Sequence, residues 1–324
     1  MQTETSSHPT GASRHQPGMG TTADTSEAQV TFEALDGATL VGTLFEPEGP
    51  PHTVLLVNSG TGIPRRFYFR FARHAAAQGF AVLTYDYRGI GGSAPDSLRG
   101  YEASYRHWGQ RDVPGAIAFL TGRFPGLPLT VIGHSTGGQQ LGLARNVSEV
   151  DAAVFIAVST GYWGGTPWHY KLLSLGLWKG YFPLATRILG YAPAKKIRWG
   201  ENLPAGVARE WGAWCMEPDY LAAFFDEGGR LAPPDGEPFG PVHFDEVTFP
   251  VRAYAFTDDP IATRANVPPM LSLFDRAELE TKWVEPSSLG MDEIGHLGFF
   301  RQRIGQPLWD DALGWLRTAS HRVG

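Results

Sequence analysis

Four short, continuous apolar runs constrain the fold of this chain more than any other feature of its sequence. They are "HTVLLVNSG", "AVLTYDYRG", "LTVIG" and "VDAAVFIAVSTG". Such runs are typical of strands whose two faces are both buried. Segments with helical spacing, such as "RRFYFRFARHAAAQGF", lie between them. Because strands that alternate with helices imply right-handed crossovers, we expect an α/β fold with a mostly parallel sheet.

The alternation of strands and helices stops in the middle of the chain and resumes towards its end. Residues 161–240 contain no evident strand run and hold six of the ten tryptophans. Beyond them, "FPVRAYAFTDDP" and "LETKWVEP" predict strands, and "PLWDDALGWLRTA" predicts a final helix. We therefore expect one α/β core, residues 27–160 and 241–324, interrupted by a helical cap insertion over residues 161–240.

The first 26 residues are rich in Ser, Thr, Gly and Pro and nearly free of large apolar side chains. They lack the apolar central segment of a secretory signal, so we expect residues 1–26 to form a disordered tail of a cytoplasmic protein. Whether translation starts at Met1 or at Met19 stays open. The single cysteine, Cys215, allows no disulfide within the chain, which fits a reducing compartment.

Composition and charge exclude several classes of function. The formal net charge of −6 argues against binding to nucleic acid or to an anionic membrane. No apolar run approaches the roughly 20 residues that a membrane span needs. Cys and His residues are not paired at metal-ligand spacing, and we expect neither a metal nor a cofactor. The sequence leaves the oligomeric state open.

One glycine-rich segment, "GIGGSA", follows a strand and formally matches the dinucleotide-binding fingerprint. That fingerprint requires the glycines to open a helix, so that the pyrophosphate meets the helix N-terminus. Pro95, Asp96 and Ser97 follow instead, and no helical pattern begins there. We therefore do not expect a nicotinamide or flavin dinucleotide.

The segment Gly133-His134-Ser135-Thr136-Gly137 has the pattern of a nucleophile elbow, a tight turn that lifts a serine oxygen clear of the backbone. An apolar strand run precedes it, and a helical pattern, "TGGQQLGLARNV", follows it. The alternative is a serine that only caps the helix. Because a serine hydroxyl is a poor nucleophile at neutral pH, catalysis would also require a base, an acid and donors for the oxyanion.

In chain order, an acid and then a histidine are expected after a nucleophile elbow. Only His296 and His321 lie beyond the late strand run, and His321 is close to the terminus. His296 is therefore the predicted base, and a surface histidine is the alternative. The predicted acid is Asp259, preferred to Asp258 because Pro260 can direct it away from the strand. Capping of the following helix is the alternative for either aspartate.

Two backbone N–H groups are expected to bind the oxyanion. One is the N–H of Thr136, at the start of the helix after the serine. The other is expected in "VNSGTGIPRR", where Gly60 lets the backbone turn and Thr61 supplies the N–H; the alternative is an ordinary glycine turn. Gly60, Trp163 and Trp168 are candidate substrate-binding residues. The alternative for the tryptophans is that they only pack the small core of the insertion.

The chain resembles the α/β-hydrolase superfamily, in particular its bacterial serine-aminopeptidase-like and monoglyceride-lipase-like members. The resemblance is carried by "LTYDYRGIGGS", "VIGHSTGG", "FTDDPIA" and "IGHLGFFR". It implies an eight-stranded, mostly parallel sheet with one antiparallel strand near its start and a helical cap after the sixth strand. It also implies Ser135, Asp259 and His296 as the catalytic triad. The segment before Thr61 departs from the family, because it lacks the usual His-Gly pair.

These features favour a serine hydrolase that cleaves carboxylic esters through an acyl-enzyme intermediate. The aromatic and leucine content of the insertion predicts small-molecule substrates with apolar acyl or aromatic groups. Two alternatives stay open. An acyltransferase would use the same triad with another nucleophile in place of water. A non-catalytic binding protein could use the same fold, since fold does not dictate function.

Overall fold

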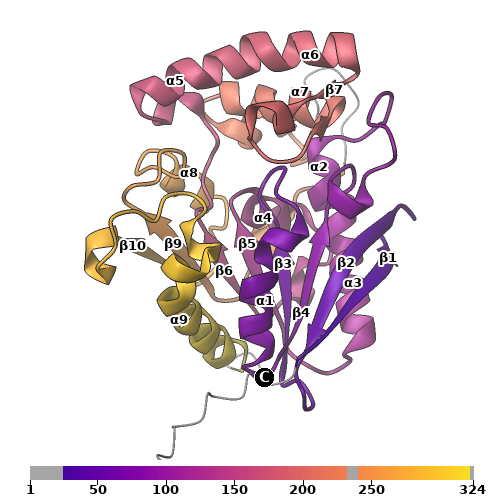
Figure 1. Cartoon of the computed structure of the whole chain (residues 1–324), viewed down its shortest axis with the longest axis vertical. Helices are drawn as coiled ribbons and strands as arrows, with labels where there is room; N and C mark the ends of the chain where they lie inside the picture. The colour runs from indigo at the N-terminus through magenta and orange to yellow at the C-terminus, as the bar shows by residue number, and fades with distance from the viewer. Residues whose placement is uncertain (1–24, 232–239, 322–324) are drawn as a thin grey trace, which may run out of the picture.

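The computed structural model describes residues 25–231 and 240–321 of the 324-residue chain (Figure 1). Residues 1–24 of the expected tail, with Met19, lie outside the described residues. So do residues 232–239 of the expected insertion.

An eight-stranded sheet forms the centre of the molecule (Figure 1), in the order β1-β2-β4-β3-β5-β6-β9-β10. β2 runs antiparallel to both of its neighbours, and every other adjacent pair is parallel. The structure therefore confirms the expected fold class. The strands are β1 (Ser26–Glu33), β2 (Thr39–Glu46), β3 (Thr53–Asn58), β4 (Phe80–Asp86), β5 (Leu129–His134), β6 (Ala152–Ile156), β9 (Val251–Phe256) and β10 (Leu279–Val284).

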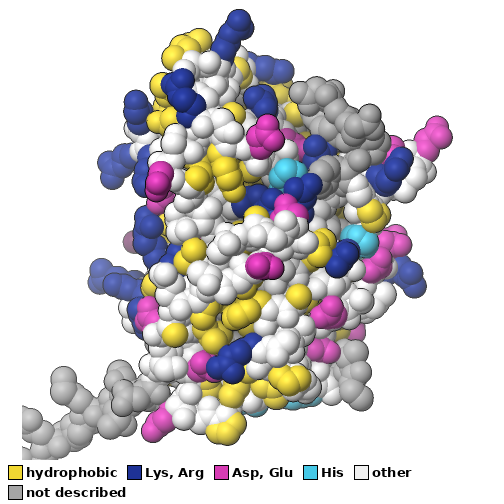
Figure 2. Space-filling view, turned by 90° about the vertical axis from the view of Figure 1, so that its right-hand side faces the viewer, with side chains coloured by type: hydrophobic (Ala, Val, Ile, Leu, Met, Phe, Trp, Pro, Cys, Tyr) yellow, Lys and Arg dark blue, Asp and Glu magenta, His cyan; other side chains and the backbone are white. Residues whose placement is uncertain are grey.

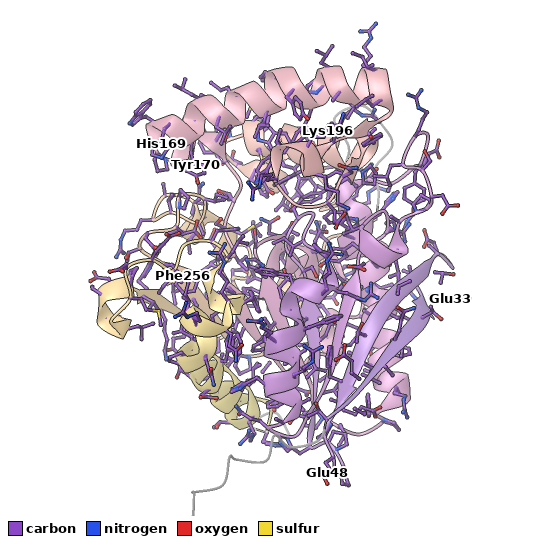
Figure 3. The ribbon with its side chains drawn as sticks, viewed as in Figure 1. Glu33, Glu48, His169, Tyr170, Lys196 and Phe256 are labelled. Atoms are coloured by element: carbon purple, nitrogen blue, oxygen red, sulfur yellow. The ribbon has the colours of Figure 1, made fainter. Side chains whose placement is uncertain are left out.

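The four inner strands β3, β4, β5 and β6 are buried at every residue, because helices cover both faces of the sheet. This burial explains why each of them reads as an unbroken apolar run in the sequence. The outer strands β1 and β10 are partly exposed and carry charged residues. Figure 3 shows Glu33, at the end of β1, and Glu48, just after β2, at opposite ends of the sheet, as an antiparallel pair requires.

Helices α1 and α9 lie in front of the sheet in Figure 1, and α3 lies behind it. The helix α1 buries Phe71, Ala72, Ala75 and Ala76 along one stripe, which is the spacing that its sequence predicts. The α-helices are α1 (Phe69–Ala76), α2 (Tyr105–His107), α3 (Val113–Arg123), α4 (Thr136–Gln139), α5 (Trp168–Leu175), α6 (Phe182–Leu189), α7 (Ala205–Met216), α8 (Val267–Leu271) and α9 (Gln302–Ser320).

The helix after Ser135 is shorter than the sequence pattern predicts. Only four residues form α4, and the 3-10 helix η4 (Gln140–Leu143) follows, so the helix does not reach Val147. The glycines of this segment account for the difference, because glycine weakens a helix interior. They are also required by packing: a Cβ on Gly142 would lie 2.2 Å from the ring of Phe244.

The segment between β6 and β9, called here the inserted segment (residues 161–231), lies beyond one end of the parallel strands (Figure 1). α5, the π-helical turn η7 (Gly176–Tyr181) and α6 follow one another directly, and α7 packs beneath them. The expectation of no strand was wrong in detail, because β7 (Tyr191–Ala192) and β8 (Leu203–Pro204) form a short antiparallel pair. Two-residue strands leave no periodic signal in a sequence.

Charge is distributed unevenly over the molecule. No Asp or Glu lies between Asp151 and Glu201, although six Lys and Arg residues do. Figure 2 shows Lys and Arg side chains gathered over the end of the molecule that the inserted segment forms. The negative net charge therefore does not describe this end. None of the described helices is both long and apolar enough to cross a membrane.

A buried ion pair joins the loop after β4 to the helical turn before α3. Asp112 accepts hydrogen bonds from the backbone N–H of Arg88, at 2.9 Å, and from its Nε, at 2.6 Å. The Arg88 guanidinium also donates two bonds of 2.8 Å to Asp36 in the β1–β2 hairpin. Asp112 therefore has a structural role, because it joins these two segments through Arg88.

Replacing Asp112 with alanine should lower the free energy of unfolding by about 3 kcal/mol, because a buried guanidinium loses a partner. The matched control is Arg73→Ala, which breaks an exposed ion pair with Glu27 and should cost less than about 1 kcal/mol. Urea unfolding of both variants measures the difference. Equal losses would contradict the structural role of the buried pair.

Candidate active site

The turn between β5 and α4 holds Ser135 in a strained conformation. Its φ of 51° and ψ of −116° lie where side chains other than glycine are rarely found. The backbone N–H of Ser135 donates to the carbonyl of Ile156 at 2.8 Å, which ties the turn to β6. In the stretch from Leu129 to Ala144, Ser135 is the one residue that is not buried. The turn therefore presents this side chain as a nucleophile elbow does.

Close backbone packing makes the turn possible. A Cβ on Gly137 would lie 2.1 Å from the carbonyl oxygen of Asn58, at the end of β3. A Cβ on Gly133 would lie 2.5 Å from the backbone of Gly138. The two glycines that flank Ser135 in the sequence pattern are therefore required by space.

The structure brings His296 and Asp259 together. The imidazole Nδ1–H donates to Oδ2 of Asp259 at 2.7 Å, which leaves Nε2 free to accept a proton. The other oxygen, Oδ1, accepts the N–H groups of Ile261 and Ala262 at 2.8 and 3.0 Å. Burial opposes ionisation of Asp259, but the charge and hydrogen bond of His296 and these two N–H groups outweigh it and lower its pKa. The carboxylate is thus ionised beside the imidazole.

Asp258 has a different position and a different set of partners. Its Oδ2 accepts the backbone N–H groups of Ile294 and Gly295 at 2.8 and 2.9 Å. It therefore holds the loop that carries His296, while Asp259 holds the imidazole itself. Of the two aspartates left open by the sequence, Asp259 is the one that contacts the imidazole of His296, the predicted base.

A hydrogen bond connects the strand end that carries Ser135 to the loop that carries His296. His134, directly before the serine, is hydrogen-bonded through Nε2 to the backbone carbonyl of His296 at 2.9 Å. The two imidazole ring centres lie 5.5 Å apart. Among the described residues, the Ser135 hydroxyl has no hydrogen bond to His296. Catalytic hydrogen bonds of this kind commonly tighten only when substrate is bound.

Sequence reasoning missed a directed chain of hydrogen bonds behind the site. Because His134 Nε2 must donate to a carbonyl, its Nδ1 is an acceptor and receives the hydroxyl proton of Tyr68 at 2.8 Å. The Tyr68 oxygen in turn accepts the backbone N–H of Gly60 at 2.8 Å. The chain connects three loops that carry predicted site residues. No local pattern reveals it, since Tyr68 and His134 are 66 positions apart.

The predicted oxyanion residues flank the same turn. The N–H of Gly60 is bound to Tyr68, which leaves the next N–H, that of Thr61, as the candidate donor of this loop. Thr136 is buried at the start of α4, directly after Ser135. No hydrogen bond with another described residue occupies the N–H of Thr61 or Thr136.

The two candidate tryptophans differ in position. Trp163 lies in the 3-10 turn η6 (Trp163–Gly165), whose Gly165 carbonyl accepts the hydroxyl of Thr263, four residues after Asp259. Trp168 lies on α5 and is 73% exposed, so its ring does not line an enclosed site. Figure 3 shows its neighbours His169 and Tyr170 on the helix above Phe256, where β9 ends.

Four other aromatic residues of the inserted segment pack against one another. The rings of Trp178 and Trp211 lie 4.7 Å apart, and those of Phe182 and Trp199 are stacked at 5.9 Å. Trp199 also contacts Trp178 and Trp211. These four rings form a small core of the segment, and neither Trp163 nor Trp168 is among them.

The described residues contain no group of three or more His, Cys, Asp or Glu that could hold a metal ion. The site consists of side chains and backbone groups at the ends of β3, β5 and β9 and in the loop after β10. A strand-to-helix turn that carries a serine, followed by an acid after a later strand and then a histidine, defines the α/β-hydrolase class on this sheet.

The comparisons with known proteins agree with the resemblance to the α/β-hydrolase superfamily. Residues 49–187 match the family described as serine aminopeptidase, S33. Human monoglyceride lipase is 30% identical over 103 residues, which are 32% of this chain and 33% of the lipase. The match thus spans about a third of the length of that curated relative. This confirms the resemblance found in the sequence.

Solved structures of esterases and lipases share the fold. A thermostable carboxyl esterase from Bacillus coagulans in complex with glycerol superposes with a TM-score of 0.58 at 15% identity, over 91% of this chain and 99% of that one. A monoglyceride lipase from Saccharomyces cerevisiae in complex with a substrate analogue gives 0.55 at 17% identity, over 89% and 94%. At these identities the likeness shows the fold alone.

Burial of His134 generates a pH-dependent prediction. Burial, with a smaller contribution from the neighbouring His296, lowers the pKa of His134 to about 3. In the unfolded chain this residue titrates near the ordinary histidine pKa of about 6.5. At a pH between these two pKa values the unfolded state binds a proton that the folded state does not. The contribution of neutral His134 to stability is therefore complete above pH ~6.5 and decreases as the pH falls.

The free energy of unfolding should therefore fall on acidification, by at most about 1.4 kcal/mol per pH unit from this one group. His134→Gln keeps a donor and an acceptor but cannot be protonated, so its pH dependence should be shallower by up to one proton. Urea unfolding between pH ~4 and pH ~7 measures both slopes. Identical slopes would show that the imidazole does not stay neutral in the folded protein.

Proposed function

We propose that this protein is a serine hydrolase that cleaves carboxylic esters through an acyl-enzyme intermediate. The observation that carries the proposal is the 2.7 Å hydrogen bond between His296 and Asp259, in a loop bonded to the residue before Ser135. The match to the serine aminopeptidase family and the partial likeness to monoglyceride lipase support an enzyme of the hydrolase class.

In the proposed mechanism, Nε2 of His296 accepts the hydroxyl proton of Ser135 as the serine oxygen attacks the ester carbonyl carbon. The N–H groups of Thr61 and Thr136 stabilise the oxyanion that forms. When the tetrahedral intermediate collapses, His296 protonates the leaving alcohol and an acyl-serine remains. Water then attacks the acyl group, His296 takes the proton of the water, and the carboxylic acid and free serine are released.

Apolar acyl or aromatic groups are the proposed substrate class. Half-buried apolar side chains flank the site residues in the sequence: Ile63 follows Thr61, Leu297 follows His296, and Trp163 lies in the turn tied to the loop after Asp259. Such side chains can bury an apolar acyl group while leaving the ester carbonyl near the serine. The self-packed aromatic core of the inserted segment does not contribute to this argument.

The inserted segment is proposed to cap the site. Its Glu201 donates a backbone N–H to the carbonyl of Gly62 at 2.7 Å, directly after the candidate oxyanion residue Thr61. Its side chain pairs with Arg66 at 2.8 Å. On the other side, Asn266 donates to the carbonyl of Tyr162 at 3.0 Å. The segment is thus bonded to loops on both sides of Ser135.

The cytoplasmic location stays a prediction of the sequence.

A panel of p-nitrophenyl esters of increasing acyl length tests the proposed reaction. The wild-type protein should release p-nitrophenol, and Ser135→Ala should lower kcat at least about 10⁴-fold, because the nucleophile is lost. Ser288→Ala, an exposed serine in a 3-10 turn, is the control and should keep full activity. Full turnover by Ser135→Ala would overturn the proposal. Acyl transfer to added alcohols in preference to water would move it to an acyltransferase.

The two aspartates give a second prediction. Asp259→Asn should lower kcat by about 10⁴-fold, because an amide favours the wrong imidazole tautomer and cannot stabilise the imidazolium. Asp258→Asn should cost much less, since its remaining carbonyl oxygen can still accept the N–H groups of Ile294 and Gly295. Steady-state kinetics of both variants with one ester separates the roles. A larger loss in Asp258→Asn would assign the acid to that residue.

A further inference from the structure

Tyr105 connects the two loops that carry the candidate oxyanion donors. It is the first residue of α2, which continues through the π-helical turn η3 (Trp108–Asp112) into α3. Its hydroxyl is hydrogen-bonded to Oγ1 of Thr61 at 2.6 Å and also to Oγ1 of Thr136. One buried hydroxyl group therefore lies between side chains of the β3–α1 loop and of the turn after β5.

These hydrogen bonds form a chain that ends at Gln139, and the bonds of Gln139 fix the direction of all the others. Gln139 donates through Nε2 to the carbonyl of Ser159 at 2.7 Å, so its Oε1 is an acceptor. Thr136 must then donate its hydroxyl proton to that oxygen, at 3.1 Å. It follows that Tyr105 donates to Thr136 and that Thr61 donates to Tyr105. The hydroxyl groups of Tyr105 and Thr136 thus each donate once and accept once within this chain.

Burial keeps this chain in one protonation state. The side chain of Tyr105 is fully buried, and burial raises the pKa of its hydroxyl above the ordinary range, although the bonds to the threonines oppose the rise. The phenol therefore holds its proton at any pH of interest. A phenolate could not donate to Thr136, so the direction of the chain does not reverse with pH.

The ring of Tyr105 is held by the inserted segment. It is stacked on Trp211 of α7 at 5.6 Å between ring centres, and it meets Trp214 of the same helix edge to face at 5.1 Å. Trp108 packs on it at 5.2 Å. Three large rings therefore fix the place of the hydroxyl, and two of them belong to the segment proposed to cap the site.

We propose that Tyr105 is a positioning residue that sets the separation of the Thr61 and Thr136 backbone N–H groups, and so the shape of the oxyanion hole. The inference rests on the proposed ester hydrolysis. The two loops come from different strands, and the side-chain bonds to Tyr105 fix the residues whose N–H groups must converge on one oxygen. A misplacement of about 1 Å in such a site can cost about 10² in rate, so one hydroxyl group can matter without touching the substrate.

The test compares Tyr105→Phe with the wild-type protein, using the best ester of the panel. The variant keeps the ring contacts and loses only the bridge. We expect kcat to fall about tenfold, less than the roughly 10²–10³ that loss of an oxyanion donor costs, because the donors remain. KM should change less than about twofold, since the oxyanion forms only in the transition state. Titration of active serines corrects each rate for the fraction of folded protein.

Phenylboronic acid supplies a readout that a merely structural role would not move. Its adduct with a serine is a tetrahedral anion that resembles the transition state, so its inhibition constant should rise about tenfold in Tyr105→Phe, in step with the fall in kcat. The control is Tyr254→Phe in β9, which removes a hydroxyl group that is bonded to Asp311 of α9 and lies away from the threonines. It should leave kcat and the inhibition constant unchanged.

Thr61→Val removes the other end of the bridge from a half-buried position, and it tests the inference even if Tyr105→Phe folds poorly. It should give a similar loss, and the double variant should lose little more than either single variant. Unchanged kcat and boronate inhibition in folded Tyr105→Phe or Thr61→Val would overturn the inference, as would a rise in KM at constant kcat. Full turnover by Ser135→Ala would instead overturn the proposed function itself.

Discussion

The site depends on how closely two backbone segments approach where β3 and β5 end. Gly137 lies so near the carbonyl of Asn58 that any side chain would collide with it, and a side chain on Gly133 would collide with Gly138. Because the strands are neighbours in a parallel sheet, their last residues are already at the same edge. The absence of side chains at these points brings the nucleophile turn and the candidate oxyanion loop into direct contact. Other features of the site are arranged around this contact.

Three polar side chains hold the loop that carries His296. Asp258 accepts two backbone N–H groups of the loop, and Asp259 accepts the N–H of the imidazole. The ring of His134 donates to the backbone carbonyl of His296. Two separate elements, the segment after β9 and the end of β5, thus hold the loop that follows the partly exposed strand β10. A base on such a loop needs this support, because efficient proton transfer requires hydrogen-bond distances.

The sheet and the order of the candidate site residues could be predicted because both produce local patterns in the sequence. Buried parallel strands read as apolar runs, and a serine between two glycines marks the turn. Tyr105 could not be predicted, because its partners Thr61 and Thr136 are 44 and 31 positions away and no spacing relates them. The aromatic residues of the inserted segment were ambiguous for a similar reason, since composition does not say which rings face one another. The helix after Ser135 was overestimated because its glycines serve packing rather than helix formation.

Ser135 is the single unburied residue in the stretch from Leu129 to Ala144, so its side chain is not needed for the packing of this stretch. Fifteen neighbours contribute to the core, whereas the hydroxyl at position 135 contributes nothing to it. Glycine at this position would even release the torsional strain of the turn, which is typically of order 1–3 kcal/mol. The fold can therefore lose its candidate nucleophile by one substitution and become more stable by doing so. A variant without this hydroxyl group would be a more stable protein than its parent.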